Sequence, residues 1–241
     1  MKNFAASLTA AAGRLPAAYP TLGASVRRRG LRLVATLPLF ASSALAGEPP
    51  PGFARLADVA PNIAQDMRYA GPDNFTGKPV PGYGAGECWL RREAAQALAR
   101  AQALAHARGF DLVVYDCYRP KRAVAAFVEW SRAPDQGTKR EYYPDVEKRD
   151  LFAEGYIAAQ STHSTGLAVD IGVKGWDFGA PFDFFDKRSW TNAPVAKAAQ
   201  AHREKLVAVM RRAGFENYPR EWWHFTFKSR GKAEALDAPI E

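Results

Sequence analysis

Apolar residues recur at every third or fourth position in three segments of this chain, which is the spacing of a helix with one buried face. The first is the alanine-rich "LRREAAQALARAQALAHARG" at 90–109, whose closing glycine stands as a helix stop. The second, "PKRAVAAFVEWSR" at 120–132, begins with proline, which the first turn of a helix tolerates. The third covers 192–215, and Gly214 is placed to end it. We expect a helix over each range.

Apolar runs between these segments indicate strands. They are "FDLVVYDCY" at 110–118, "GLAVDIGV" at 166–173 and "EWWHFTFK" at 221–228, all rich in strand-forming residues. A loop rich in Gly, Pro, Asn and Asp covers 71–86, and loops of that length in compact domains are often functional. Helices and strands mix without regular alternation, which predicts a single domain of the α+β class.

The first residues have the features of an export signal. A basic stretch, "RRRGLR", precedes the apolar "LVATLPLFASSALA", whose final Ala44-Leu45-Ala46 is a small-residue cleavage signal. We expect residues 1–46 to be removed, leaving an exported, periplasmic domain at 47–241 that starts after Ala46. The apolar run is short and contains Pro38, so the mature chain is expected to have no membrane span. The export route, general or twin-arginine, and the true start codon stay open.

The distribution of charge argues against a nucleic-acid partner. The formal charge of +8 at pH 7 would fit an anionic ligand. Every charged side chain before residue 47 is basic, however, so the remaining chain is close to neutral. We therefore expect no nucleic acid to be bound.

Export also affects how the two cysteines, Cys88 and Cys117, are interpreted. Disulfides persist in oxidising compartments, so we expect these residues to form a bridge. The alternative is a pair of separate buried thiols. In the chain-entropy model, a bridge that closes a loop of this length stabilises the fold by about 3 to 4 kcal/mol.

Two of the four histidines stand beside carboxylates in turn or strand contexts. His163, Asp170 and His224 would supply the three protein ligands that zinc hydrolases use, with the fourth position left for water and Glu221 left as a base. A polar loop and a polar strand edge would explain the same residues, and spacing alone leaves both readings open. The other two histidines fall within predicted helices and are interpreted as structural: His106 and His202.

The metal hypothesis carries one geometric requirement. In an extended strand the side chains of Glu221 and His224 would point to opposite faces, because alternate residues face opposite sides. For both to face one metal, the chain must bend between them. Pro219, just upstream, makes an irregular start to this strand plausible.

The residues around these positions resemble a known family. "STHSTGLAVD" followed by "EWWH" is similar to the Ser-x-His-x-x-Gly-x-Ala-x-Asp and Glu-x-x-His signatures of zinc-dependent D-alanyl-D-alanine dipeptidases of the VanX type. Further stretches follow in family order: "DNFTGKPVPGY", "YDCYRPKRAV", "YYPDVEK", "PFDFFDKRS" and "NYPREWWHF". The resemblance runs from about Phe53 to Phe227 and favours the metal site over the polar loop.

The resemblance implies roles for the metal-site residues. It implies one Zn²⁺ per chain with three ligands, His163, Asp170 and His224. Glu221 is then the catalytic base, and Arg119 the cation that stabilises the transition state. These roles agree with what the residue types can do, because a carboxylate can relay a proton and a permanent cation can hold a developing oxyanion.

Three more residues match positions that the family uses to bind the dipeptide: Ser161, Asp183 and Tyr69. Asp183 is the candidate partner of the free ammonium group. The fold implied is the α+β zinc-peptidase fold shared with D,D-carboxypeptidases and hedgehog-like domains, with a central, mainly antiparallel sheet flanked by helices. The cysteines depart from the cytoplasmic members, and a bridge would tie the segment carrying Arg119 to the first predicted helix.

The resemblance implies hydrolysis of D-Ala-D-Ala to two D-alanines in cell-wall peptide turnover, with a small dipeptide as substrate. One alternative is a D,D-carboxypeptidase or endopeptidase acting on peptidoglycan stem peptides. Another is a zinc-containing cell-wall binding module without catalysis. The range of accepted side chains and the oligomeric state stay open.

Overall fold

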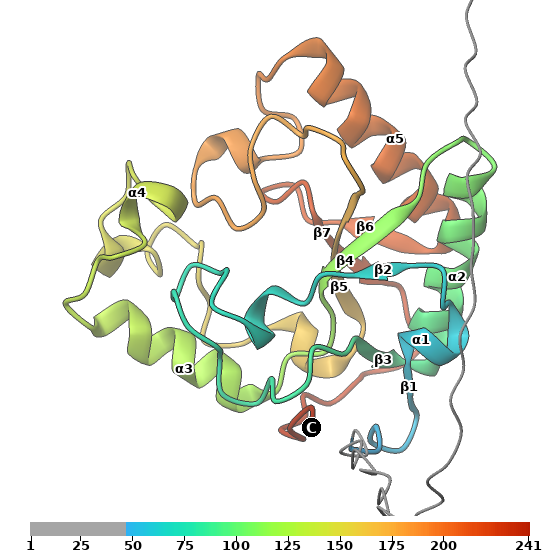
Figure 1. The fold of residues 1–241 in the computed structure, drawn as a ribbon, viewed down its shortest axis with the longest axis horizontal. Coiled ribbons are helices and arrows are strands. Elements are labelled where there is room, and N and C mark those ends of the chain that lie inside the picture. The colour runs from blue at the N-terminus through green and yellow to red at the C-terminus, as the bar shows by residue number, and fades with distance from the viewer. Residues whose placement is uncertain (1–46) are drawn as a thin grey trace, which may run out of the picture. The chain divides into compact units, whose positions relative to one another are not determined.

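A computed structural model describes residues 47–241, so the predicted export signal at 1–46 lies outside the described residues. Within 47–241, a five-stranded sheet with the order β2-β4-β5-β7-β6 lies at the centre (Figure 1). Its strands are β2 (Ala64–Gln65), β4 (Leu112–Asp116), β5 (Ala168–Val173), β6 (Phe215–Asn217) and β7 (His224–Phe227). The β2–β4 pair is parallel and the other three pairs are antiparallel. The predicted α+β class with a mainly antiparallel sheet is confirmed.

Helices and a small second sheet flank the central strands. In Figure 1, α2 lies at the right of the sheet, packed against α5, while α3 and α4 lie at the left. The helices are α1 (Leu56–Val59), α2 (Arg92–His106), α3 (Lys121–Arg132), α4 (Lys139–Tyr142) and α5 (Lys197–Ala213). The second sheet pairs β1 (Phe53–Arg55) with β3 (Trp89–Arg91). Short 3₁₀ turns are η1 (Arg68–Ala70), η2 (Lys148–Asp150), η3 (Thr162–Thr165) and η4 (Lys187–Ser189).

The observed elements follow the sequence pattern, with shifts at their ends. The helix expected at 192–215 begins only at Lys197, after a non-helical stretch that contains Pro194. It ends at Gly214, whose φ of 101° is accessible to glycine at little cost. The strand expected at 221–228 begins only at His224, because the preceding residues form a turn.

Strand register places polar side chains in one row across the sheet. Asp116 of β4 lies opposite Asp170 of β5, and Asp170 lies opposite His224 of β7. Directly opposed residues in neighbouring antiparallel strands share a face, so all three project to the same side. A register irregularity between Val114 and Asp116 precedes this row on β4, as is common beside functional sites.

The predicted bridge between Cys88 and Cys117 is present, with the two Cα atoms 5.2 Å apart. Cys88 directly precedes β3 and Cys117 directly follows β4, so the bridge joins the small sheet to the central one. Both residues are buried in the main hydrophobic core. None of the helices in residues 47–241 is long and apolar enough to span a membrane.

The last residues of the chain close over several elements. The Leu236 N–H donates to the Ser164 carbonyl, and the Leu236 carbonyl accepts from the Lys121 N–H at the start of α3. Ile240 is fully buried and hydrogen-bonds with the backbone of Gly82 and Ala85 in the loop expected at 71–86. The C-terminal segment thus fixes that loop and α3 relative to the central sheet.

Candidate metal centre and active site

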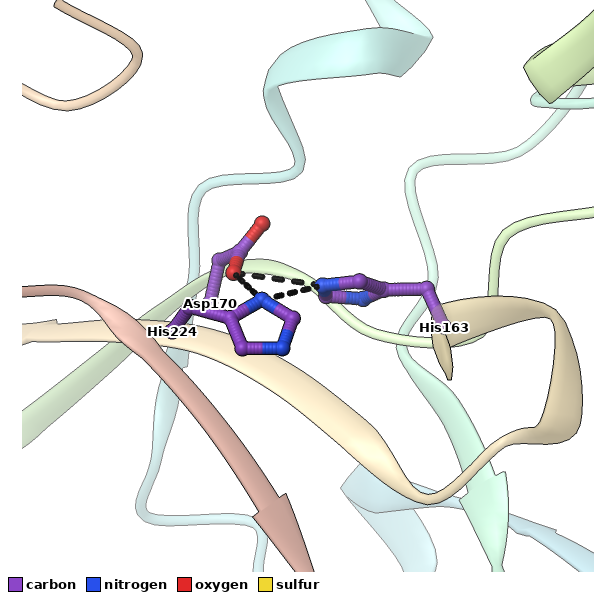
Figure 2. A group of neighbouring side chains, drawn as sticks. All are labelled: His163, Asp170 and His224. Carbon is purple, nitrogen blue, oxygen red and sulfur yellow. Dashed lines mark hydrogen bonds and ion pairs between the residues drawn. The ribbon is translucent and has the colours of Figure 1, made fainter. Parts of the chain in front are cut away.

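His163, Asp170 and His224 converge at one point from three separate segments (Figure 2). The Oδ1 atom of Asp170 lies 3.2 Å from Nε2 of His163 and 3.1 Å from Nδ1 of His224. The two nitrogens are themselves 3.1 Å apart. Two imidazole nitrogens and a carboxylate oxygen facing one another form a donor set that suits Zn²⁺ and leaves a coordination position free. The three residues therefore fit a zinc ion.

His163 is oriented by the short helix that carries it. Ser161 caps η3, where its Oγ accepts the His163 N–H at 3.2 Å, and Gly166 ends η3 with a φ of 74°. A Cβ atom at Gly166 would clash with the ring of Phe53, so only glycine lets the chain turn back into β5 here. On the far side of the imidazole, Nδ1 lies 2.7 Å from the carbonyl oxygen of Cys117. A carbonyl can only accept, so Nδ1 donates to it, and Nε2 is the nitrogen that faces Asp170 and is available to a metal.

His224 presents its other nitrogen to the site. Its Nδ1 atom faces Asp170, and its Nε2 atom lies 3.4 Å from the hydroxyls of Thr162 and Thr226. Burial would lower the pKa of His224, but the carboxylates of Asp170 and Glu221 outweigh burial and raise it. Burial would likewise raise the pKa of Asp170, and the neighbouring histidines instead hold it well below its usual range. The electrostatics of this cluster therefore favour a cation at its centre.

The bend required between Glu221 and His224 is present. The Glu221 N–H donates to the Tyr218 carbonyl at 3.0 Å, and the His224 N–H is 3.3 Å from the Glu221 carbonyl. This turn brings Glu221 Oε2 to 3.6 Å from Nδ1 of His224, on the same side of the chain. Burial raises the pKa of Glu221, as suits a carboxylate that must accept a proton near neutral pH.

Arg119 is held beside the cluster by a buried carboxylate. Asp116 Oδ2 accepts from Nε at 3.0 Å and from Nη2 at 2.8 Å, and Nη2 lies 3.5 Å from Asp170 Oδ2. The guanidinium also lies over the rings of Tyr69 and Phe127. Burial would lower the pKa of Arg119, but Asp116 and its other neighbours raise it well above the ordinary value, so the side chain stays a cation.

Two of the substrate-binding candidates line the same cavity and contact each other. The Tyr69 hydroxyl donates to Asp183 Oδ2 at 2.8 Å, and both residues are buried. Asp183 has a φ of 58°, which is uncommon for a residue other than glycine. Burial, followed by the charge of Asp170, raises the pKa of Asp183 well above its usual value. A carboxylate in such a place is suited to a cationic ligand, which would repay its desolvation.

A buried arginine on α5 holds the loop that carries Asp183. Arg203 is completely buried and donates to the carbonyl oxygens of Phe178, Arg188 and Trp190 at 2.7, 2.8 and 2.6 Å. These carbonyls lie on both sides of Asp183 along the chain. Arg203 therefore fixes both ends of the loop and with them the position of Asp183.

One cavity of about 460 Å³ brings the sequence-predicted residues together. Its wall includes all eight: Tyr69, Arg119, Ser161, His163, Asp170, Asp183, Glu221 and His224. Aromatic residues supply much of the remaining wall, among them Phe75, Phe127, Tyr156, Phe185 and Trp223. A small polar peptide would meet carboxylates, one arginine and ring faces here.

Sequence reasoning missed the groups that position Arg119 and His163 through hydrogen bonds. Asp116 holds Arg119, lies 3.3 Å from Nδ1 of His163 and accepts from the Tyr83 hydroxyl at 2.7 Å. The sequence feature that could have identified Asp116 is its position at a strand end, three residues before Arg119. The contact of the Cys117 carbonyl with His163 had no signal, because every residue type carries the same backbone group.

Comparison with known proteins agrees with this geometry. A family model of the peptidase M15 family, described as D-ala-D-ala dipeptidase, matches residues 51–239. The chain is 38% identical over 199 residues to the D-alanyl-D-alanine dipeptidase of Enterococcus faecium, covering 79% of this chain and 98% of that relative. The Enterococcus faecalis protein of that name is 39% identical over 182 residues, covering 72% and 90%. The Streptomyces coelicolor protein of that name is 38% identical over 202 residues, covering 78% and 98%. This chain therefore belongs to the D-ala-D-ala dipeptidase family of zinc metallopeptidases.

Proposed function

We propose that this protein hydrolyses D-alanyl-D-alanine to two D-alanines, using the residues that line the cavity. The observation that carries the proposal is the convergence of His163, Asp170 and His224 beside Glu221 and Arg119. A metal-binding triad alone would serve structure equally well. The added carboxylate and arginine supply the proton relay and the charge stabilisation that peptide hydrolysis requires.

His163, Asp170 and His224 would hold one Zn²⁺ per chain. When bound, the ion would supply Lewis-acid polarisation of the peptide carbonyl and lower the pKa of water toward about 7. The side chains contribute the rest. Glu221, turned toward the same point, accepts the proton of the attacking water and delivers it to the leaving amine.

Arg119 stabilises the oxyanion that develops on the peptide carbonyl. Two hydrogen bonds to Asp116 fix the direction of the guanidinium before substrate binds, so little reorganisation is needed during the reaction. Asp116 takes up Nε and Nη2, and Arg119 keeps further N–H groups for the substrate.

Asp183 binds the free ammonium group of the dipeptide, and Tyr69 and Ser161 help to orient it. A buried carboxyl group in the cavity wall favours a substrate with a free amino terminus, because an ammonium group stabilises the charged form of a carboxyl whose pKa burial raises. A D,D-carboxypeptidase would instead need an open groove there for a longer peptide. The burial of Asp183 and Tyr69 therefore supports the dipeptidase over this second candidate.

The test is turnover of D,D-, L,D- and D,L-dipeptides and of a stem pentapeptide by zinc-loaded and chelated protein. We expect zinc-dependent cleavage of D-Ala-D-Ala and slower cleavage of the pentapeptide. Preference for the pentapeptide would select the carboxypeptidase instead. If neither the wild type nor Glu221→Ala cleaved any of these peptides, the protein would be a binding module.

Residues 1–46 act as an export signal in this proposal, and the catalytic domain at 47–241 works in the periplasm. An enzyme in that compartment meets dipeptides released from the wall, and not the cytoplasmic precursor pool. N-terminal sequencing of the protein from a periplasmic extract tests this. A chain that begins near Gly47 is expected, and retention of residues 1–46 in the cytoplasm contradicts it.

A further inference from the structure

The imidazole of His163 is held by the backbone of one of the two bridged cysteines. The carbonyl of Cys117 accepts the Nδ1–H of His163 at 2.7 Å, on the side of the ring opposite the metal-binding nitrogen. Such hydrogen bonds fix the tautomer and the ring orientation of a histidine ligand, and losing one typically weakens metal binding 10- to 100-fold. The position of this single carbonyl therefore matters for the metal centre.

Cys117 stands where regular structure stops. β4 ends at Asp116 and α3 begins only at Lys121, so sheet pairing does not extend to this carbonyl. The disulfide to Cys88 holds the residue there, together with the hydrogen bond from the Tyr118 N–H of the same peptide unit to the Trp89 carbonyl. Cys88 is itself fixed on both sides, because its N–H donates to Gln65 Oε1 and its carbonyl accepts from the Leu56 N–H, each at 2.8 Å.

The same segment contacts His163 a second time. The Arg119 N–H lies 3.3 Å from the His163 carbonyl, while the Tyr118 N–H donates to the Trp89 carbonyl at 2.9 Å. The bridge, the segment from Cys117 to Arg119 and the His163 ring thus form one connected unit. Both cysteines are buried, with exposed fractions of 1% and 0%, so solvent reductants have little access to the bridge in the folded protein.

We propose that the Cys88–Cys117 disulfide is a positioning element of the metal centre, acting on His163 through the Cys117 carbonyl. The inference rests on the proposed metal centre and adds a role for the bridge beyond stabilising the fold. Without the bridge, the peptide unit of Cys117 and Tyr118 keeps only its hydrogen bonds to Trp89 and His163, so its carbonyl is less firmly placed, His163 samples more orientations, and the ion is held less tightly.

The test compares the zinc affinity of the wild type with that of a Cys88→Ala, Cys117→Ala double variant. Affinity is measured by competition with a chromophoric chelator at fixed pH. The absorption spectrum of the Co²⁺-loaded protein reports ligand geometry. We expect the dissociation constant for zinc to rise by about tenfold, with an altered Co²⁺ spectrum, in a protein whose circular dichroism is native.

Leu98→Ala is the matched control, because Leu98 is fully buried in α2 and its loss destabilises the fold without removing the bridge or the Cys117 hydrogen bond to His163. This control should bind zinc as tightly as the wild type. If the double variant keeps wild-type affinity, or if Leu98→Ala loses as much, the positioning role is wrong.

A second measurement tests the proposal if the double variant fails to fold. The wild-type chain is prepared with the bridge formed and with both thiols reduced, and the two forms are compared in the same zinc competition. Equal affinities overturn the proposal. A wild type that binds no zinc overturns it together with the metal centre. Tight, bridge-dependent zinc binding without D-Ala-D-Ala cleavage rejects only the proposed substrate.

Discussion

The guanidinium of Arg119 is fixed by geometry as much as by charge. Two of its nitrogens bind one oxygen of Asp116, and the planar group lies over two aromatic rings. Lysine would keep the positive charge but lose the fork-shaped donor set and the flat stacking surface. A lysine at position 119 therefore tests whether the orientation of the guanidinium matters in addition to its charge.

Replacing Arg119 by lysine should lower kcat for D-Ala-D-Ala by about 10²- to 10³-fold, the loss found when one oxyanion donor is removed. Zinc affinity should stay near that of the wild type, because Arg119 does not belong to the triad. Steady-state kinetics and zinc competition on one preparation check this. A variant with unchanged kcat would mean that the positive charge is sufficient and that the orientation of the guanidinium does not matter.

Replacing Asp183 by asparagine removes the charge opposite the substrate ammonium and keeps the shape of the side chain. Truncating one partner of a buried charge pair costs about 2 to 5 kcal/mol, so KM for D-Ala-D-Ala should rise by at least about 30-fold. An N-acetylated dipeptide is the comparison, since it lacks the ammonium group. Equal losses on both peptides would contradict the assignment.

At the scale of elements, buried polar groups hold the loops that regular structure leaves free. Arg203 joins α5 to the loop carrying Asp183 through three carbonyls and no carboxylate. Burial lowers the pKa of Arg203 more than the charge of Asp177 raises it, yet arginine remains charged, so the three carbonyl oxygens solvate the cation.

Arg203→Met should lower the free energy of unfolding by about 3 to 5 kcal/mol, because it leaves buried carbonyl groups without donors. Chemical denaturation measures this change. Arg211→Met, at an exposed position of the same helix, is the control and should change stability by no more than about 0.5 kcal/mol. Similar effects for the two variants would remove the anchoring role.

The C-terminal segment is joined to α3 by Asp237. Its Oδ1 accepts from the backbone N–H and the Nε of Arg122, and the hydrogen bond from that side chain lowers the pKa of Asp237. A lowered pKa contributes stability above the unfolded value, about 3.9, which is lost as pH falls through the folded value. The pairing therefore stabilises at neutral pH and fades in acid.

The stability difference between wild type and Asp237→Asn should be constant above about pH 5 and shrink below about pH 4. Urea midpoints of both proteins at several pH values provide the measurement. A difference that persists at low pH would show that the amide substitution acts through packing and not through charge.

For the whole molecule, metal binding and folding are linked. The buried triad does not exist in the unfolded chain, so zinc at about 1,000 times its dissociation constant should stabilise the protein by about 4 kcal/mol. Chelation should lower both Tm and dipeptidase activity, and added zinc should restore them. Thermal scans across a zinc titration check this, with His163→Ala as the variant that should not respond.

The sequence predicted the long elements of this molecule better than its short ones. The apolar periodicity of α2, α3 and α5 was visible because each helix repeats its pattern over several turns. β2 spans two residues and β6 three, too few for a pattern to form, and their pairing depends on partners distant in sequence. Motif resemblance identified the residues that the cavity gathers. It did not reveal Asp116 or Arg203, whose tasks depend on the backbone and side chains that the fold places beside them.

Asp170 and His224 belong to the row of opposed residues that begins at Asp116, so the metal centre can form only when β5 and β7 pair in the correct register. A slip of one residue between β5 and β7 would turn Asp170 and His224 to opposite faces and break the triad. During refolding, tight zinc capture must then wait until these two strands have paired correctly. The moment at which the ion is taken up would report the pairing of β5 with β7.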